Sequence, residues 1–259
     1  MWQFNTLVAL HVVTGTVGLI TMWVPVIGKK GGDTHRRWGR IFSHALLLTG
    51  IFAIGISLVT LRYPLETHPF SDDAAMVRGI FGWMMLYLAT LTIMLSRYGI
   101  WCIQNRRNHP ANRHALNLSL QAATFVTAAN CAWQGHMINQ PLMIGISIIG
   151  LLSSLLNTRF IFQKSPPLNE WLIQHTRGLV GAGISVYTAF FAFGAVNLMP
   201  HLAFNPILWS TPCTLGIGLL LYHQYKIMMQ RRRLRQMKRA PLHGINTVSY
   251  THLRAPRPY

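Results

Sequence analysis

Seven runs of predominantly apolar residues divide this chain, and each is long enough to cross a lipid bilayer. A helix needs about 20 such residues to span the hydrocarbon core. Only 11% of the 259 residues are charged, whereas a soluble domain carries about 25%. The sequence therefore predicts an all-α, polytopic transmembrane helix bundle within residues 1–230. Its seven spans are expected at residues 4–27, 40–62, 79–103, 115–137, 140–162, 177–199 and 206–228.

Lysine and arginine are concentrated in the loops that follow the first, third, fifth and seventh runs. The alternate loops contain few of them, and residues 65–73 carry three of the five acidic residues. Because cytoplasmic loops carry the excess of lysine and arginine, we expect the N-terminus outside and the C-terminus inside. Residues 231–244 are then a basic cytoplasmic tail. Residues 245–259 lack an apolar face, and we expect them to be a non-native or disordered tail.

The net charge of +18 would suggest nucleic-acid binding in a soluble protein. Here the basic residues form short clusters between apolar runs, which indicates contact with the bilayer and its anionic lipid headgroups instead. We therefore expect no nucleic-acid partner. The three cysteines are isolated in the sequence and are expected to be buried free thiols.

A short and very basic hinge, from Gly28 to His44, separates the first two apolar runs. Arg36, Arg40 and His44 recur every four residues, so they share one face if the second helix extends back into the hinge. Arginines in this position can bind the propionates of a haem or the phosphate of a lipid. The alternative is a basic helix start whose arginines extend toward the membrane surface.

Histidines are unusually frequent for a membrane protein, with 12 of them against five carboxylates. Neutral imidazole binds haem iron or a transition metal without introducing negative charge. His44, His175 and His223 are predicted at similar depth on three helices near the inner interface, where they could be cofactor or metal ligands. His11 is a further candidate, but it belongs to the opposite leaflet. Small residues follow His11 on its helical face, so a hydrogen bond across a tight helix pair is the alternative there.

Amide and hydroxyl side chains are concentrated in the fourth apolar run. Asn117, Gln121 and Thr124 share one helical face by their spacing of four and three residues. We expect this helix inside the bundle, where other helices satisfy these groups. The interpretation as interhelical hydrogen bonding is favoured over a polar path for a solute.

Three segments of the chain carry sequence motifs: LHVVTG in the first run, KGGDTHRRWGRIF in the hinge and WLIQHTRGLVGAGISVYTAFF in the sixth run. With these segments the chain resembles an uncharacterised family of bacterial multi-pass membrane proteins, of the domain-of-unknown-function type. The resemblance implies a location in the bacterial cytoplasmic (inner) membrane, and it brings no activity with it. His44 and His223 fall outside the motifs. The motif positions are His11, His35, Arg36, Gly39, Arg40 and His175.

The function that these patterns favour is a redox component with histidine-ligated haem b, or a transition metal, that exchanges electrons with a quinone or another redox partner. One alternative is a carrier of small solutes that uses the amide-rich fourth helix. Another is a non-catalytic membrane assembly factor or lipid-interacting factor. No nucleophile–base pair, phosphate-binding loop or carboxylate dyad indicates hydrolysis, and the oligomeric state is left open.

Overall fold

The computed structural model describes residues 2–194 and 206–239, and within these residues the chain is helical, with no strand. The first half contains α1 (Trp2–Thr21), α2 (Trp23–Ile27), α3 (Asp33–Arg62), α4 (Pro64–Thr67), α5 (Ala74–Val77), the π-helical segment η1 (Arg78–Met84) and α6 (Met85–Gln104). The second half contains the 3-10 segment η2 (His109–Arg113), α7 (Ala115–Met137), α8 (Pro141–Phe162), α9 (Glu170–Ala189), the π-helical segment η3 (Phe190–Gly194) and α10 (Pro206–Arg239).

Each of the seven predicted apolar runs coincides with helical structure in the described residues. Four stretches are long and apolar enough to cross a membrane, namely Trp2–Ile27, Asp33–Arg62, Ala74–Gln104 and Pro141–Phe162. This finding supports the predicted class of all-α membrane protein. In the described parts of the chain, the more polar helices α7, α9 and α10 do not meet the same criterion.

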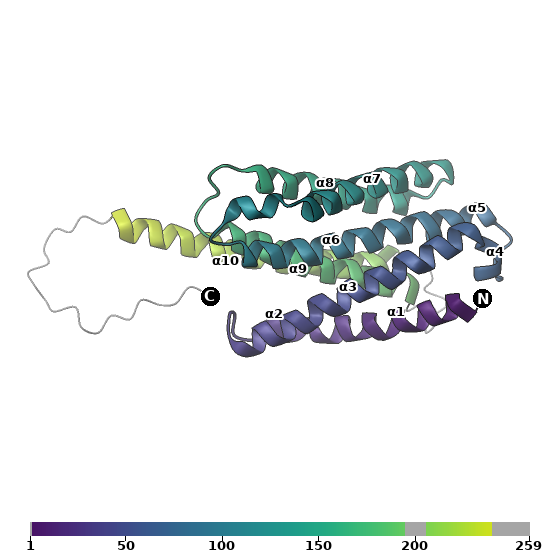
Figure 1. Ribbon diagram of the computed structural model, residues 1–259, viewed down its shortest axis with the longest axis horizontal. Helices are drawn as coiled ribbons and strands as arrows, with labels where there is room; N and C mark the ends of the chain where they lie inside the picture. The colour runs from purple at the N-terminus through teal and green to yellow at the C-terminus, as the bar shows by residue number, and fades with distance from the viewer. Residues whose placement is uncertain (1, 195–205, 240–259) are drawn as a thin grey trace, which may run out of the picture.

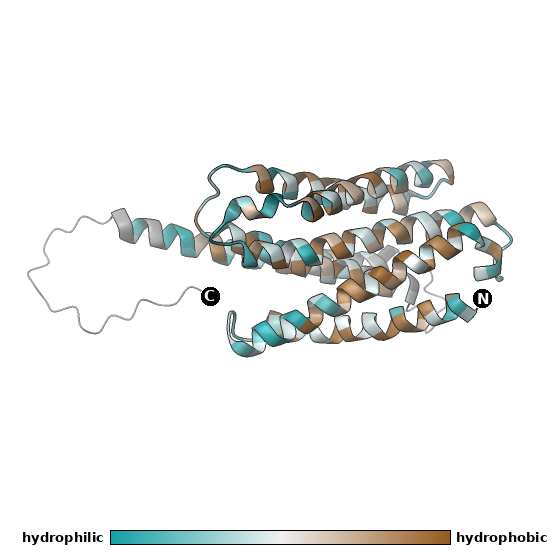
Figure 2. Ribbon diagram, viewed as in Figure 1, coloured by the Kyte–Doolittle hydropathy of each residue, from teal (hydrophilic) through white to brown (hydrophobic). Residues whose placement is uncertain are grey.

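Helix α6 lies at the centre of an elongated bundle, where it packs against α9, α3 and α7 (Figure 1). Helix α1 packs on α3, α8 packs on α7, and α10 packs on α9. The core therefore follows α6: its buried side chains include Tyr87, Met94 and Tyr98. Figure 2 shows hydrophobic residues along the helices of the bundle, and many large apolar side chains are exposed, among them Val13, Val126 and Leu155, as expected for a bundle surrounded by lipid.

The contact between α6 and α9 depends on two glycines. A Cβ atom on Gly178 would lie 2.7 Å from the Cα atom of Gly99 and from the carbonyl oxygen of Leu95. The two backbones therefore touch, which is the close approach that small residues allow in membrane helices. Gly178 lies near the start of the sixth apolar run, and its packing on α6 explains a glycine at this position.

The amide-rich face of α7 lies inside the bundle, as predicted: Asn117, Gln121 and Thr124 are all buried. Gln121 donates to the Oδ1 atom of Asn117 at 3.2 Å, and Asn157 of α8 donates to the Oε1 atom of Gln121 at 3.4 Å. Asn117 in turn donates to the carbonyl oxygen of Asn112 at 2.8 Å. The amides thus bind one another and the backbone, which supports interhelical hydrogen bonding and not an open polar path.

Charge separates the two ends of the bundle. One end carries the α2–α3 turn, the C-terminal end of α6 and the N-terminal end of α9, and we call it the basic end (left in Figure 1). The opposite end carries α4 and α5 with Glu66, Asp72 and Asp73. At the basic end α10 continues as a helix to Arg239, so the first residues of the predicted basic tail are helical. Residues 240–259, which include the predicted terminal tail, lie outside the described residues.

Candidate functional site

A cavity of about 790 Å³ lies at the basic end, between the first two turns of α3, the C-terminal end of α6 and the N-terminal part of α9. Four of the seven predicted site residues line it: His35, Arg36, Arg40 and His175. Residues 33–44 of the hinge belong to helix α3, which begins at Asp33. The remaining wall is formed by Pro25, Asp33, Thr34, Arg37, Trp38, Gly39, Ile100, Ile103, Gln104 and Leu179.

His35 is held in the first turn of α3 by the preceding helix. Its Nδ1 atom lies 3.1 Å from the carbonyl oxygen of Pro25 in α2. A carbonyl oxygen only accepts, so Nδ1 carries the proton and Nε2 is the unprotonated nitrogen of the neutral ring. No hydrogen bond of Nε2 is found among the described residues.

His175 is fixed in the same manner on the other side of the cavity. The ring is buried in α9, and its Nδ1 atom lies 2.8 Å from the carbonyl oxygen of Gly99 in α6. Its Nε2 atom likewise has no hydrogen bond to the described part of the chain. A histidine that ligates a metal through one nitrogen almost always donates its other N–H to a carbonyl, a carboxylate or water. Both rings of this cavity therefore have the hydrogen bonding of ligand histidines.

Gly39 leaves open space in the wall between the two histidines. A Cβ atom added there would meet no other atom within 4 Å, so packing does not require glycine at this position. Glycine in the interior of a helix is about 1 kcal/mol less favourable than alanine. The missing side chain instead enlarges the cavity and would let a flat ligand approach the α3 backbone.

The cavity is strongly cationic. Arg37 and Arg40 line it without an acidic partner among the described residues, whereas Arg36 is paired with Asp33. Lys30 lies beside the turn and donates through Nζ to the carbonyl oxygens of Pro25, at 2.8 Å, and Val26. Burial lowers the pKa of Lys30, and the nearby ammonium group of Lys226 on α10 lowers it further. The site therefore favours an anionic group and opposes a bare cation.

His11 does not line this cavity. Its Nδ1 atom lies 3.1 Å from the carbonyl oxygen of Thr49, across the contact between α1 and α3. Gly15 and Gly18 on the same face are buried, and a Cβ atom on Gly18 would lie 2.7 Å from Leu46. The structure thus has the hydrogen bond across a tight helix pair that was the alternative to ligand binding.

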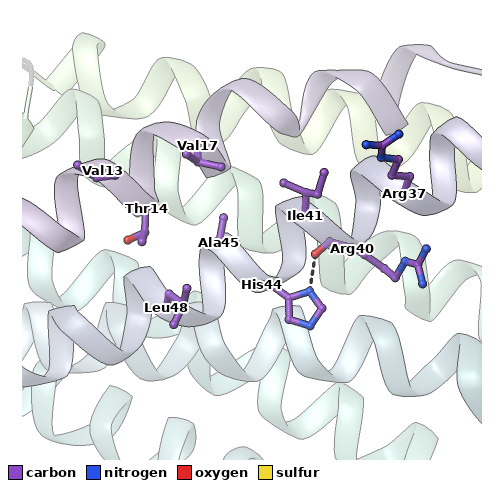
Figure 3. A pocket seen from close by; sticks show the side chains of 9 residues that line it. All are labelled: Val13, Thr14, Val17, Arg37, Arg40, Ile41, His44, Ala45 and Leu48. Atoms are coloured by element: carbon purple, nitrogen blue, oxygen red, sulfur yellow. Dashed lines mark hydrogen bonds between the residues drawn. The ribbon is translucent and has the colours of Figure 1, made fainter.

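The structure does not bring His44 and His223 together with His175 as a three-histidine site. His44 is exposed, and its Nδ1 atom donates to the carbonyl oxygen of Arg40 at 2.8 Å within the same helix (Figure 3). His223 is half-buried on α10 beside the ring of Tyr222. Among the described residues no three His, Cys, Asp or Glu side chains form a group that could hold a metal ion. Helix rotation explains the difference, because equal depth does not place side chains on facing surfaces.

Several wall residues were not singled out from the sequence, and Arg37 and Leu179 are two of them. For Arg37 the signal was present, because it is the second arginine of the HRR segment in the hinge. Leu179 belongs to an apolar helix and carries no chemical signal. Only the packing of α9 on α6 brings it to the cavity.

Comparison of the chain with protein-family models, with curated proteins and with solved structures finds no match. The family resemblance of the three motifs stays a prediction.

Proposed function

We propose that this chain is a seven-span protein of the bacterial cytoplasmic membrane, N-terminus outside and C-terminus inside, that binds haem b between His35 and His175 and takes part in electron transfer. The observation that carries the proposal is the shared cavity of these two histidines, each with Nδ1 bound to a backbone carbonyl. An iron porphyrin in this position supplies one-electron chemistry, and a quinone or another redox protein is the partner.

The topology is supported by the match between apolar runs and helices and by the distribution of charge. Three of the five acidic residues lie at the end with α4 and α5, and the arginines of the hinge lie at the other end. The positive-inside rule assigns the basic end to the cytoplasm. The motif segments of the hinge and of α9 meet in one cavity.

Electrostatics favour haem over a bare metal ion. The cavity has three arginines in its wall and one carboxylate, Asp33, which is already paired with Arg36. A divalent cation with two neutral imidazoles would be repelled by this surrounding. The two propionates of a haem bring negative charge, and guanidinium groups bind carboxylates with two parallel hydrogen bonds. The open space beside the Cα atom of Gly39 is suited to a flat macrocycle.

The chain's own residues would have separate roles at this site. The carbonyls of Pro25 and Gly99 orient the two rings, and Ile100, Ile103 and Leu179 contribute apolar wall. Apolar surroundings and burial are two of the means by which a protein sets the reduction potential of a bound haem.

The test is the visible spectrum of the protein purified from membranes of cells supplied with haem. We expect a Soret band that shifts on reduction with dithionite, and loss of this band in His35→Ala and in His175→Ala. His44→Ala is the matched control, because its ring also binds a carbonyl but lies outside the cavity. Size-exclusion chromatography of each variant reports whether it is folded.

Rescue separates a ligand role from a structural one. In His35→Gly, added imidazole is expected to restore the Soret band, because the free ring can occupy the space of the lost side chain. A colourless wild-type protein, or a band that survives both cavity substitutions, would overturn the proposal. A band lost only in His11→Ala would move the haem to the α1–α3 contact and overturn the His35–His175 assignment.

A further inference from the structure

A second cavity, of about 620 Å³, forms a groove between α1 and α3 on the outer surface of the bundle (Figure 3). Its walls are apolar, with Val13 and Val17 on α1 and Ile41 and Leu48 on α3. Ala45 and Thr14 also line it, and their small side chains leave the space between the walls. The groove runs along two helices that are long and apolar enough to span a membrane.

The groove is open to the surroundings of the protein. Val13 exposes 62% of its surface and Leu48 exposes 44%, although both belong to apolar helices. Exposed aliphatic side chains on such helices face lipid chains in a bilayer. The groove is therefore accessible to a molecule within the membrane.

One end of the groove is cationic. Arg37, Arg40 and His44 lie there, next to the apolar walls (Figure 3). Neither arginine has an acidic partner among the described residues. Of the five carboxylates, Asp33 is paired with Arg36 and Glu170 with Arg231. The other three carboxylates lie at the opposite end of the bundle.

We propose that this groove is a binding site for one anionic phospholipid of the leaflet at the basic end. The phosphate lies at Arg37 and Arg40, and one acyl chain lies along Val13, Val17, Ile41 and Leu48. The complementarity of charge and polarity carries this assignment: two guanidinium groups that have no acidic partner among the described residues lie at one end of an apolar groove. Guanidinium binds phosphate through paired hydrogen bonds, and basic residues at this level attract anionic lipids.

The site does not depend on haem. Arg37 and Arg40 line both cavities, but the apolar walls of the groove belong to the groove alone. Substitution of both arginines is therefore expected to weaken haem binding as well as lipid binding, whereas His175 lines the haem cavity only and separates the two sites. His175→Ala is expected to lose the haem and keep the lipid.

The test is native mass spectrometry of the delipidated full-length protein, titrated with phosphatidylglycerol or with phosphatidylcholine of the same acyl chains. We expect one tightly bound phosphatidylglycerol, with an affinity roughly tenfold higher than for phosphatidylcholine. Arg37→Gln with Arg40→Gln is expected to abolish this preference. The matched control is Arg106→Gln with Arg107→Gln, two exposed arginines at the same end that do not line the groove.

A second measurement locates the lipid even if the double variant does not fold. Wild-type protein is labelled with phosphatidylglycerol that carries a photoreactive group in one acyl chain, and the labelled peptides are mapped. Labels on residues 13–17 and 41–48 support the proposal. Equal binding of both lipids, equal loss in the control variant, labels confined to other helices, or a native mass spectrum in which the protein is a dimer that binds no phosphatidylglycerol would each overturn it.

Discussion

His175 on α9 donates from Nδ1 to the carbonyl oxygen of Gly99 on α6 at 2.8 Å. The Cα and N atoms of the same Gly99 lie at the point where the two helices touch, next to the missing side chain of Gly178. The orientation of the imidazole and the spacing of the helices are therefore set by one contact. Any change in this helix contact is expected to alter the candidate site.

Gly178→Ala is expected to destabilise the protein by about 1–3 kcal/mol, the usual effect of forcing extra atoms into a packed contact. The new Cβ atom would lie 2.7 Å from the Cα atom of Gly99, and backbone cannot move aside as a side chain can. Thermal unfolding in detergent, followed by circular dichroism, measures the effect. Gly145→Ala is the control, since nothing lies within 4 Å of its added Cβ atom. Equal stability of the two variants would contradict the backbone contact.

Two substitutions of Gly39 are expected to have different effects, one on the stability of the protein and the other on ligand binding. Gly39→Ala should stabilise the ligand-free protein by up to about 1 kcal/mol, because alanine favours the helix and meets no neighbour. Gly39→Leu should fill the cavity and lower the Soret absorbance per protein, while the protein stays folded. Circular dichroism and the visible spectrum measure the two effects. Full haem content in Gly39→Leu would show that no ligand approaches the backbone at this position.

The ion pair between Arg231 on α10 and Glu170 on α9, at 3.0 Å, is mostly buried, with side-chain exposures of 12% and 18%. Glu170→Gln is expected to destabilise the protein by about 3 kcal/mol, because the remaining guanidinium group stays buried and uncompensated. Adding Arg231→Met should restore part of this loss. The control is Asp33→Asn, since the pair of Asp33 and Arg36 is exposed by 96% and 65% and such pairs contribute under about 1 kcal/mol. Chemical unfolding of the wild type and of the three variants tests the difference.

His68 is expected to make stability depend on pH. The ring stacks on Phe81 with centroids 4.2 Å apart, and burial lowers its pKa below 6.5. The unfolded chain therefore takes up a proton at higher pH than the folded protein. Stability should be complete above pH 6.5, fall as the pH drops through this value, and level off below the folded pKa.

The melting temperature between pH 4.5 and 8 measures the contribution of His68. In His68→Phe, which keeps a ring against Phe81, the dependence on pH should be weaker than in the wild type. His136→Phe, at an exposed histidine, should retain the wild-type dependence. Identical profiles for all three proteins would show that His68 does not contribute.

Apolar length and polar spacing were sufficient to predict the helices and the interior face of one of them. The run predicted at 115–137 is α7, and its amides are buried as expected from their spacing. Their spacing of four and three residues places the three side chains on one helical face, so all three are buried together when this face packs inside the bundle. In a soluble protein the apolar face of a helix is buried, whereas here the amide-bearing face is buried. Lipid surrounds the apolar faces, and other helices provide hydrogen bonds to the amides.

The choice among histidines could not be predicted in the same way. The first turns of α3 are basic on all sides, so the sequence does not indicate whether His35 or His44 faces the bundle. Packing decides it: His35 lies toward α6 and α9, and His44 lies toward the outer groove. The π-helical turn at Arg78–Met84 was also missed, because one extra residue per turn barely changes an apolar run.

The backbone contact between Gly99 and Gly178 has a further consequence for how this protein can move. Because backbone meets backbone at this crossing, any relative shift of α6 and α9 would disturb their closest contact, and we expect the two helices to move together with His175. If the proposed haem is bound there, its ligand would rearrange little when the charge of the iron changes, which would keep the barrier to electron exchange low.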